Sequence, residues 1–192
     1  MIRRGFKMDE MVTLFFFIFG LVFGSFFNVV GLRIPKNESI VYPNSHCPKC
    51  NHELSWYENI PVLSYIILWG KCRVCKSRIS TIYPIMELVT GILFAFSFHY
   101  FGWSQETAAA ILLSSLLVII TVSDIAYMMI SDKVLVFFFI AFVILRIVYP
   151  LSPWWDSILA AFIGFGILYL LGVISRGGMG GGDIKLLFVL GI

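Results

Sequence analysis

Charged residues are scarce in this chain of 192 residues, because Asp, Glu, Lys and Arg make up only 13% of it. A soluble domain carries about 25%. Hydrophobic residues account for 59% of the chain, and the mean hydropathy is +0.92. We also expect the apolar run at 11–30 not to be a cleavable signal sequence, since it is too long for one and no small-residue cleavage site follows it. These absences exclude an ordinary soluble domain and predict an all-α polytopic membrane protein.

Basic residues are few as well, and they cluster instead of covering a surface. Seven of the fourteen Lys and Arg residues lie at 33–81, where topology explains them, so nothing indicates nucleic-acid binding. Counting the apolar runs places ten on this side of the membrane and four on the other. Because cytoplasmic loops carry the excess of Lys and Arg, we expect residues 33–81 to be cytoplasmic and the N-terminus external.

Six apolar runs organise the chain. About 20 apolar residues cross a bilayer, and we expect five spanning helices at 11–32, 82–101, 107–123, 134–149 and 157–175. A sixth run begins at Ile184 and meets the chain end. The chain therefore divides into residues 1–32 with the first spanning helix, a small cytoplasmic domain at 33–81, called the cysteine loop below, and a membrane core at 82–192.

All four cysteines lie in the cysteine loop, as two C-x2-C pairs separated by twenty-one residues: Cys47, Cys50, Cys72 and Cys75. A two-residue spacer lets one turn present two thiolates, and a structural zinc ion takes four in a tetrahedron. A cytoplasmic location disfavours disulfides. The pattern therefore predicts a structural zinc site that holds together a domain without a core of its own, with His46 and His52 as substitute ligands.

The cysteine loop also contains an apolar run of about ten residues, between Trp56 and Trp69, which is too short to span a membrane. It either packs on the membrane surface or forms the small core of the loop.

A carboxylate beside a membrane-length apolar run is costly and marks a functional site by default. Asp183 follows five glycines at 177–182, which disfavour a helix and leave backbone open to a peptide. Asp124 ends the third apolar run, and the expected topology places both acids at the cytoplasmic edge of the membrane. If they meet, they share a proton, and one can act as acid while the other activates water. The alternatives are two unrelated acids, and Asp183 as the N-cap of a helix from Ile184.

Two further acids have other expected roles. Asp132, with Ser131 before it, is predicted to be the N-cap of the fourth spanning helix. Glu87 lies inside the second spanning helix, where it could pair with a loop Arg, bind a substrate amine or, as we favour, have a structural role.

Gly24, Ser25 and Asn28 share one small, polar face of the first helix, which favours a helix–helix contact over substrate binding.

Several motifs in one order make the chain similar to bacterial type IV prepilin peptidases along essentially its whole length. They are Gly24-Ser-Phe-Phe-Asn-Val-Val-Gly-Leu-Arg-Ile-Pro35, the two cysteine pairs, Trp56-Tyr-Glu-Asn-Ile-Pro-Val-Leu-Ser-Tyr65, Gly70-Lys-Cys-Arg, Ile79-Ser, Tyr83-Pro with Glu87-Leu, and Gly-Gly-Gly-Asp183.

This resemblance implies a GxGD-type aspartic endopeptidase in the bacterial inner membrane. It implies cleavage of the leader of type IV prepilins or pseudopilins after a Gly, on the cytoplasmic side. N-methylation of the new N-terminal residue with S-adenosylmethionine is implied as well. The family's catalytic acids map onto Asp124, which opens its Asp-x5-Ile-x-Asp pattern, and onto Asp183.

Two departures from the family pattern stand out. Ser131 replaces the usual Pro, and the chain stops nine residues after Asp183, whereas family members continue for further spans. We therefore expect the membrane core to be truncated at its C-terminus. Two other functions stay open: a GxGD intramembrane protease with other substrates, and a non-catalytic membrane scaffold of a secretion or competence apparatus. No glycine-rich nucleotide fingerprint follows a strand, so the sequence assigns no residue to the methyl donor.

Overall fold

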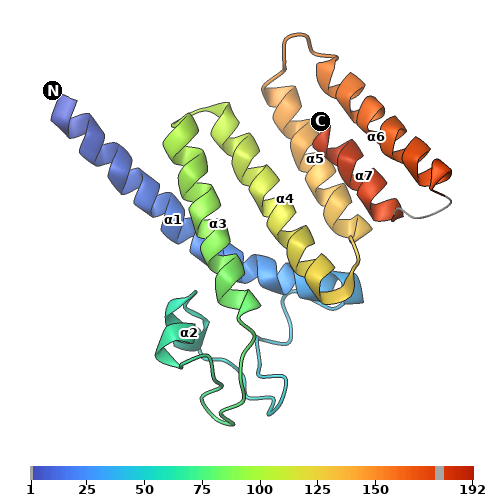
Figure 1. Ribbon diagram of the computed structural model, residues 1–192. Coiled ribbons are helices and arrows are strands. Elements are labelled where there is room, and N and C mark those ends of the chain that lie inside the picture. The colour runs from blue at the N-terminus through green and yellow to red at the C-terminus, as the bar shows by residue number, and fades with distance from the viewer. Residues whose placement is uncertain (1, 176–179) are drawn as a thin grey trace. The chain divides into compact units, whose positions relative to one another are not determined.

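The structure, a computed structural model, describes the backbone of residues 2–175 and 180–192, with side chains from residue 9 onward (Figure 1). The part of the glycine stretch at 176–179 lies outside the described residues. The described chain forms helices and loops without any β-strand. It falls into two compact units, Met1–Val122 and Ser123–Ile192, which are described separately below.

Helices occupy all six positions at which apolar runs predicted them. They are α1 (Ile2–Arg33), α3 (Ile82–Phe101), α4 (Gln105–Tyr127), α5 (Asp132–Val148), α6 (Asp156–Ile174) and α7 (Gly181–Leu190). Within the described residues, four of them, α1, α3, α4 and α6, are long and apolar enough to cross a membrane. Helix α5 has 17 residues and α7 has 10, fewer than the roughly 20 of a typical span. The predicted all-α polytopic fold is confirmed.

The cysteine loop connects α1 to α3 and contains little regular structure. Its short elements are two 3-10 helices, η1 (Ile34–Lys36) and η2 (Trp56–Asn59), and the five-residue helix α2 (Leu63–Ile67). Two isolated β-bridges, His46 with Glu53 and Lys71 with Arg78, close the turns that carry the cysteine pairs.

Helix α1 runs obliquely across α3 in the first unit, and glycines let the two backbones touch (Figure 1). A Cβ atom at Gly20 would lie 2.7 Å from Gly91 Cα, and one at Gly24 would lie 2.7 Å from Glu87 Cα. Helices associate in lipid through small residues of this kind, since close approach increases van der Waals contact. The helix–helix contact expected at Gly24 is confirmed.

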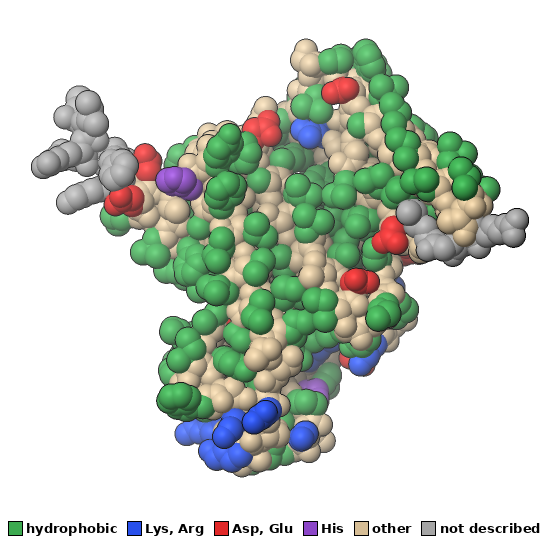
Figure 2. Space-filling model, viewed as in Figure 1, with side chains coloured by type: hydrophobic (Ala, Val, Ile, Leu, Met, Phe, Trp, Pro, Cys, Tyr) green, Lys and Arg blue, Asp and Glu red, His purple; other side chains and the backbone are tan. Residues whose placement is uncertain are grey.

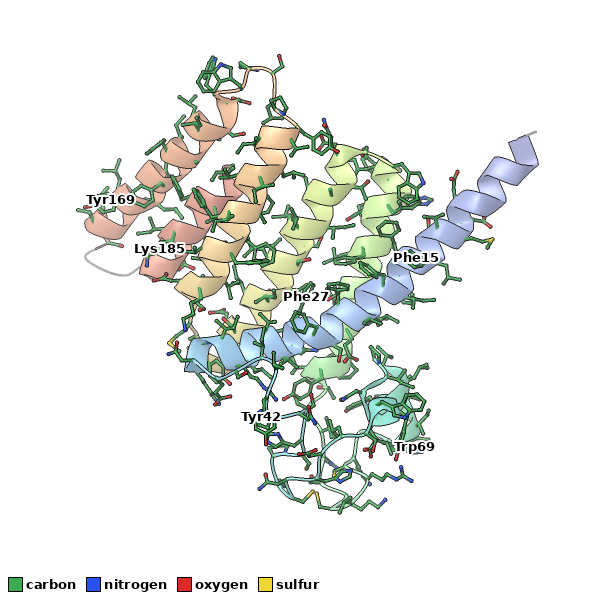
Figure 3. All side chains as sticks on the ribbon, turned by 180° about the vertical axis from the view of Figure 1, so that it is seen from behind. Phe15, Phe27, Tyr42, Trp69, Tyr169 and Lys185 are labelled. Atoms are coloured by element: carbon green, nitrogen blue, oxygen red, sulfur yellow. The ribbon has the colours of Figure 1, made fainter. Side chains whose placement is uncertain are left out.

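Aromatic side chains fill the rest of this crossing. Phe94 of α3 is fully buried, with the rings of Phe23 and Phe27 each 6.4 Å away, while Phe16 stacks on Phe98 at 4.7 Å (Figure 3). Asn28 donates a hydrogen bond of 3.2 Å to the carbonyl of Tyr83, which adds a polar contact at the same interface.

Helix α7 packs against both α5 and α6 in the second unit. The ring of Phe188 stacks on Phe139 of α5 at 5.9 Å and meets Phe162 and Phe165 of α6 edge-on. A Cβ atom at Gly191 would lie 2.4 Å from Ala161 Cα, so the end of α7 touches the backbone of α6. The second unit is therefore a small bundle that fixes the first turn of α7, where Asp183 lies.

The α1–α3 crossing predicts a difference between two Gly→Ala substitutions. We expect Gly24→Ala to lower stability by about 1–3 kcal/mol, because the new methyl group overlaps the α3 backbone. Gly166→Ala in α6, where nothing lies within 4 Å of the added Cβ, should be neutral or slightly stabilising. Thermal unfolding of both purified variants in detergent measures the difference, and equal stabilities would contradict the crossing.

Candidate functional site

Asp124 lies in the last turn of α4 with its side chain exposed. The chain turns directly after it: the Met128 N–H donates to the Asp124 carbonyl at 2.8 Å, and Met128 has a φ of +52°. The Ser123 hydroxyl donates to the carbonyl of Met129, which ties this turn back to the helix. Asp124 therefore stands at a helix end that local hydrogen bonds define.

Asp183 lies in the first turn of α7, not at its N-cap. The helix begins at Gly181, and Gly180 is the N-cap, with extended backbone and an oxygen that accepts the Asp183 N–H at 3.1 Å. Of the roles that the sequence left open for Asp183, the N-cap of a helix from Ile184 does not agree with the structure. Glycine costs about 1 kcal/mol in a helix, but the contacts of Phe188 hold α7 in place and offset this cost.

Asp132 is not an N-cap either. Ser131 occupies that position, and Asp132 is the first residue of α5. Both Asp132 carboxylate oxygens instead accept hydrogen bonds of 2.8 Å from Nζ of Lys185 on α7 (Figure 3). No sequence signal links residues this far apart in the chain, so the ion pair was missed. Both side chains are more than half exposed, so we expect it to contribute about 1 kcal/mol or less.

The turn between α4 and α5 meets the start of α7. A Cβ atom at Gly182, the residue before Asp183, would lie 3.0 Å from Cβ of Ile130. Together with the Asp132–Lys185 pair, this contact brings the segment that follows Asp124 against the turn that carries Asp183. No hydrogen bond or ion pair joins the two carboxylates in the described part of the chain, so their shared proton stays a prediction.

The four cysteines form two matching turns in the cysteine loop. The Cys47 N–H donates to the His52 carbonyl at 2.9 Å, and the Cys72 N–H donates to the Ser77 carbonyl at 2.8 Å. In each turn the residue after the second cysteine, Asn51 or Lys76, has a positive φ. The two C-x2-C motifs therefore fold alike.

These turns bring four thiols to one point. The Sγ atoms of all four cysteines lie within 4.8 Å of one another, and none forms a disulfide. Cys47 and Cys75 are 3.8 Å apart, as are Cys50 and Cys72. Zinc–sulfur bonds of about 2.3 Å in a tetrahedron require sulfur atoms about 3.8 Å apart. The cluster could therefore hold a metal ion of this size.

Backbone and hydroxyl groups around the cluster favour thiolates. The N–H groups of Lys49 and Cys50 lower the pKa of Cys47 to about 6, and the Ser77 hydroxyl lowers the pKa of Cys75. The His52 N–H lowers the pKa of Cys50, but burial and the neighbouring thiols outweigh this effect and raise that pKa to about 11. Four adjacent sulfurs cannot all ionise without a cation, which a bound metal would supply.

The flanking histidines have other partners. His46 Nδ1 lies 3.0 Å from the Asn44 carbonyl, and His52 Nε2 lies 3.2 Å from Oε2 of Glu58. Glu58 is buried and caps η2, and the Ser55 N–H bond and His52 together lower the pKa of its carboxyl group. The structure therefore gives neither histidine the substitute role that the sequence left open.

Glu87 joins α3 to the cysteine loop. Its Oε2 accepts the N–H of Val62 at 2.7 Å, so it pairs with backbone and not with a loop Arg. Val62 is strained, with φ +61° and ψ −48°, and the Leu63 N–H donates to the Pro61 carbonyl across it at 2.6 Å. A β-branched residue adopts a positive φ rarely. The hydrogen bond that Val62 donates to Glu87 therefore contributes to holding this turn, the structural role we favoured.

A pocket of about 460 Å³ lies between the cysteine loop and the adjoining ends of α1 and α3. Carboxylates, guanidinium groups and aromatic rings share its wall: Glu58, Glu87, Arg33, Arg73, Arg78, Tyr65 and Tyr83. Two buried oxygens in this wall, Asn28 Oδ1 and Glu58 Oε1, have no hydrogen-bond partner. Buried polar atoms are nearly always paired, so this pocket is suited to a polar ligand. No sequence motif indicated this pocket, since its lining residues come from several segments that are separate in the chain.

Comparison with known proteins covers almost the whole chain. Residues 18–101 match the bacterial peptidase A24 N-terminal domain, and residues 111–192 match the type IV leader peptidase family. A prepilin leader peptidase/N-methyltransferase of Bacillus subtilis is 45% identical over 91% of this chain and 71% of its own length. The proteins of that name in Myxococcus xanthus and Klebsiella pneumoniae are 38% and 31% identical.

This chain spans 56% of the Myxococcus relative and 82% of the Klebsiella relative. No solved structure matches. The motifs of both halves and the identity to these relatives lead to one conclusion: the chain belongs to the type IV leader peptidase family.

Proposed function

We propose that this protein is an aspartic endopeptidase that removes the leader of type IV prepilin-like or pseudopilin precursors after a Gly, with Asp124 and Asp183 as its catalytic acids. The match at 111–192 contains both acids. The observation that carries the proposal is the contact between Ile130 and Gly182, which joins the segment after Asp124 to the turn of Asp183. The membrane is the bacterial inner membrane, and the site faces the cytoplasm, as the Lys and Arg distribution indicates.

The two acids have different roles because they lie at opposite kinds of helix end. Asp183 is near the start of α7, where free N–H groups stabilise an anion, so we assign it as the base. Asp124 is at the end of α4, where free carbonyl groups disfavour an anion, so we assign it as the acid.

Asp183 takes a proton from water, which attacks the scissile carbonyl carbon, while Asp124 gives its proton to the carbonyl oxygen. When the resulting diol collapses, the C–N bond breaks. The leaving amine takes the proton held by Asp183, and Asp124 regains one from the hydroxyl group. Both acids then return to their initial state.

The glycines before Asp183 suit the substrate. A prepilin has a short basic leader followed by an apolar helix, so its cleavage point lies at the membrane edge. Glycines have no side chain to obstruct an extended peptide, and open space surrounds the Cβ position of Gly181. The peptide can therefore approach the backbone at the start of α7.

N-methylation of the new N-terminus is the second activity we propose, with S-adenosylmethionine held in the pocket of the cysteine loop. When bound, this cofactor supplies a methyl group on a sulfonium ion. Glu58 and Glu87 in its wall fit the positive groups of this cofactor, and Arg73 and Arg78 fit its carboxylate. The pocket volume of about 460 Å³ accommodates a molecule of this size.

We also propose that the metal of the four cysteines is zinc, and that its role is structural. Four thiolates in a tetrahedron are the preferred ligands of structural zinc and leave no position for a substrate. The cysteine loop contains few buried apolar residues, so the metal would replace a hydrophobic core.

The acid pair is tested by neutralising each acid. We expect Asp124→Asn and Asp183→Asn each to slow leader cleavage at least about 100-fold, because each removes one proton-transfer group. Asp156→Asn is the matched control, since Asp156 also lies in a first helical turn of the second unit, and it should cleave normally. Mass spectrometry of the product N-terminus after incubation with a prepilin measures cleavage and methylation together.

Normal processing by either site variant would refute the dyad. If the wild-type protein leaves prepilins intact but cuts another membrane helix, it is an intramembrane protease of other substrates. Full biological function with Asp183 neutralised would indicate a scaffold.

The donor pocket is tested by binding. We expect Glu58→Gln to weaken binding of labelled S-adenosylmethionine about tenfold, because it removes a negative charge from the wall of the pocket that would hold this cation. Glu53→Gln, an exposed change in the same loop, should bind normally. Leader cleavage should persist in both variants, and unchanged binding in Glu58→Gln would contradict this location.

The metal site is tested by Cys72→Ser, which replaces one of the two buried cysteines. We expect elemental analysis to show loss of the zinc found in the wild-type protein, and the cysteine loop to become sensitive to protease. A chelator should have the same effect on the wild type, and added zinc should reverse it. A loop that resists protease without any metal would contradict the proposal.

A further inference from the structure

The apolar run of the cysteine loop is exposed instead of buried. Leu63, Ile66 and Ile67 of α2 are 57%, 61% and 73% exposed, and Trp69, just after the helix, is 88% exposed. Of the two alternatives that the sequence left open, these side chains do not form the core of the loop. Their outward surface is called the α2 ridge below.

Helix α2 has two distinct faces. Ser64, Tyr65 and Leu68 point inward and line the pocket. The ridge residues 63, 66 and 67 recur at helical spacing, so they form the opposite face. Trp69, with a φ of +54°, turns its ring outward beside them, on the opposite side of the loop from Tyr42 (Figure 3). The ridge is therefore an ordered apolar surface and not a loose loop tip.

The ridge is attached to a membrane-spanning helix at its base. Val62, which precedes α2, donates its N–H to Glu87, the sixth residue of the candidate span Ile82–Phe101. This bond places the start of α2 within contact of the first two turns of α3. The start of α2 therefore lies beside the beginning of this candidate span, where Ile85 and Leu88 are exposed apolar side chains as well.

Charge follows the same pattern. Exposed basic residues come directly after Trp69 in the chain: Lys71, Arg73, Lys76 and Arg78. Figure 2 shows a hydrophobic patch on this part of the molecule, with a cluster of basic side chains below it. Tryptophan at the headgroup level and nearby Lys and Arg that attract anionic lipids are typical of interfacial segments.

We propose that the α2 ridge inserts into the boundary between headgroups and acyl chains of the membrane from which α3 emerges. Its occupant is lipid, because a hydrogen bond joins the start of α2 to a candidate membrane span and exposed basic residues follow the ridge in the chain. The ridge holds the cysteine loop, with its pocket and its metal cluster, at a fixed depth beside the bilayer. This proposal does not depend on the peptidase or methyltransferase assignments.

The test uses the full chain in lipid nanodiscs, with a photo-reactive diazirine amino acid at Ile66 or at Ile67. Val74 is the matched control, because it is 60% exposed in the same loop but lies in the second cysteine turn. After illumination, mass spectrometry identifies adducts with lipid, water or protein. We expect at least about fivefold more lipid adducts at Ile66 and Ile67 than at Val74.

Equal lipid labelling at all three positions, or water adducts alone at Ile66 and Ile67, would overturn the proposal. Adducts with protein at Ile66 or Ile67 would also overturn it, since they would show that a partner covers the ridge. The metal content of each labelled protein is measured to check that the cysteine loop is folded. We expect it to be unchanged, because all three positions are exposed and none of them is one of the four cysteines.

Discussion

The Glu87 carboxylate lies inside an apolar spanning helix, and an unpaired polar group there would be costly. The backbone N–H of Val62 satisfies it at 2.7 Å. This hydrogen bond joins the membrane segment to the cysteine loop, so it holds the start of α2 beside α3. Glu87 also lines the pocket between the cysteine loop and the ends of α1 and α3. A residue that the sequence could place only as an acid in a helix thus organises the whole polar part of the first unit.

The second unit depends on contacts between the α4–α5 turn and the start of α7. The α4–α5 turn reaches the start of α7 because Gly182 has no side chain to keep Ile130 away. The Asp132–Lys185 pair reinforces this contact at the surface. Helix ends carry partial charges and unpaired backbone groups, and the proposed roles of Asp124 and Asp183 rest on this difference between the end of α4 and the start of α7.

The cysteine cluster shows how far local sequence can specify a site. Each C-x2-C turn folds by its own hydrogen bonds, with a residue at positive φ directly after it. The sequence predicted that both pairs meet at one metal site, and the four Sγ atoms do lie within 4.8 Å of one another. Sulfur distances of 3.8 Å agree with a tetrahedral ion. What the sequence did not predict is that the two turns have the same hydrogen bonds and backbone conformation.

The sequence by itself determined the helices and the cysteine turns, because hydropathy and short-range hydrogen bonding act over a few residues. It placed helices at six positions and found the helix contact at Gly24. Its division into 1–32, 33–81 and 82–192, like its choice of Asp124 and Asp183, stays a prediction.

Only the tertiary structure decided the partners of the acids. It gave Asp132 a lysine 53 residues away and Glu87 a backbone N–H, and it started α7 before Asp183. Contacts between residues far apart in the chain leave no periodic signal, since they depend on how whole helices pack.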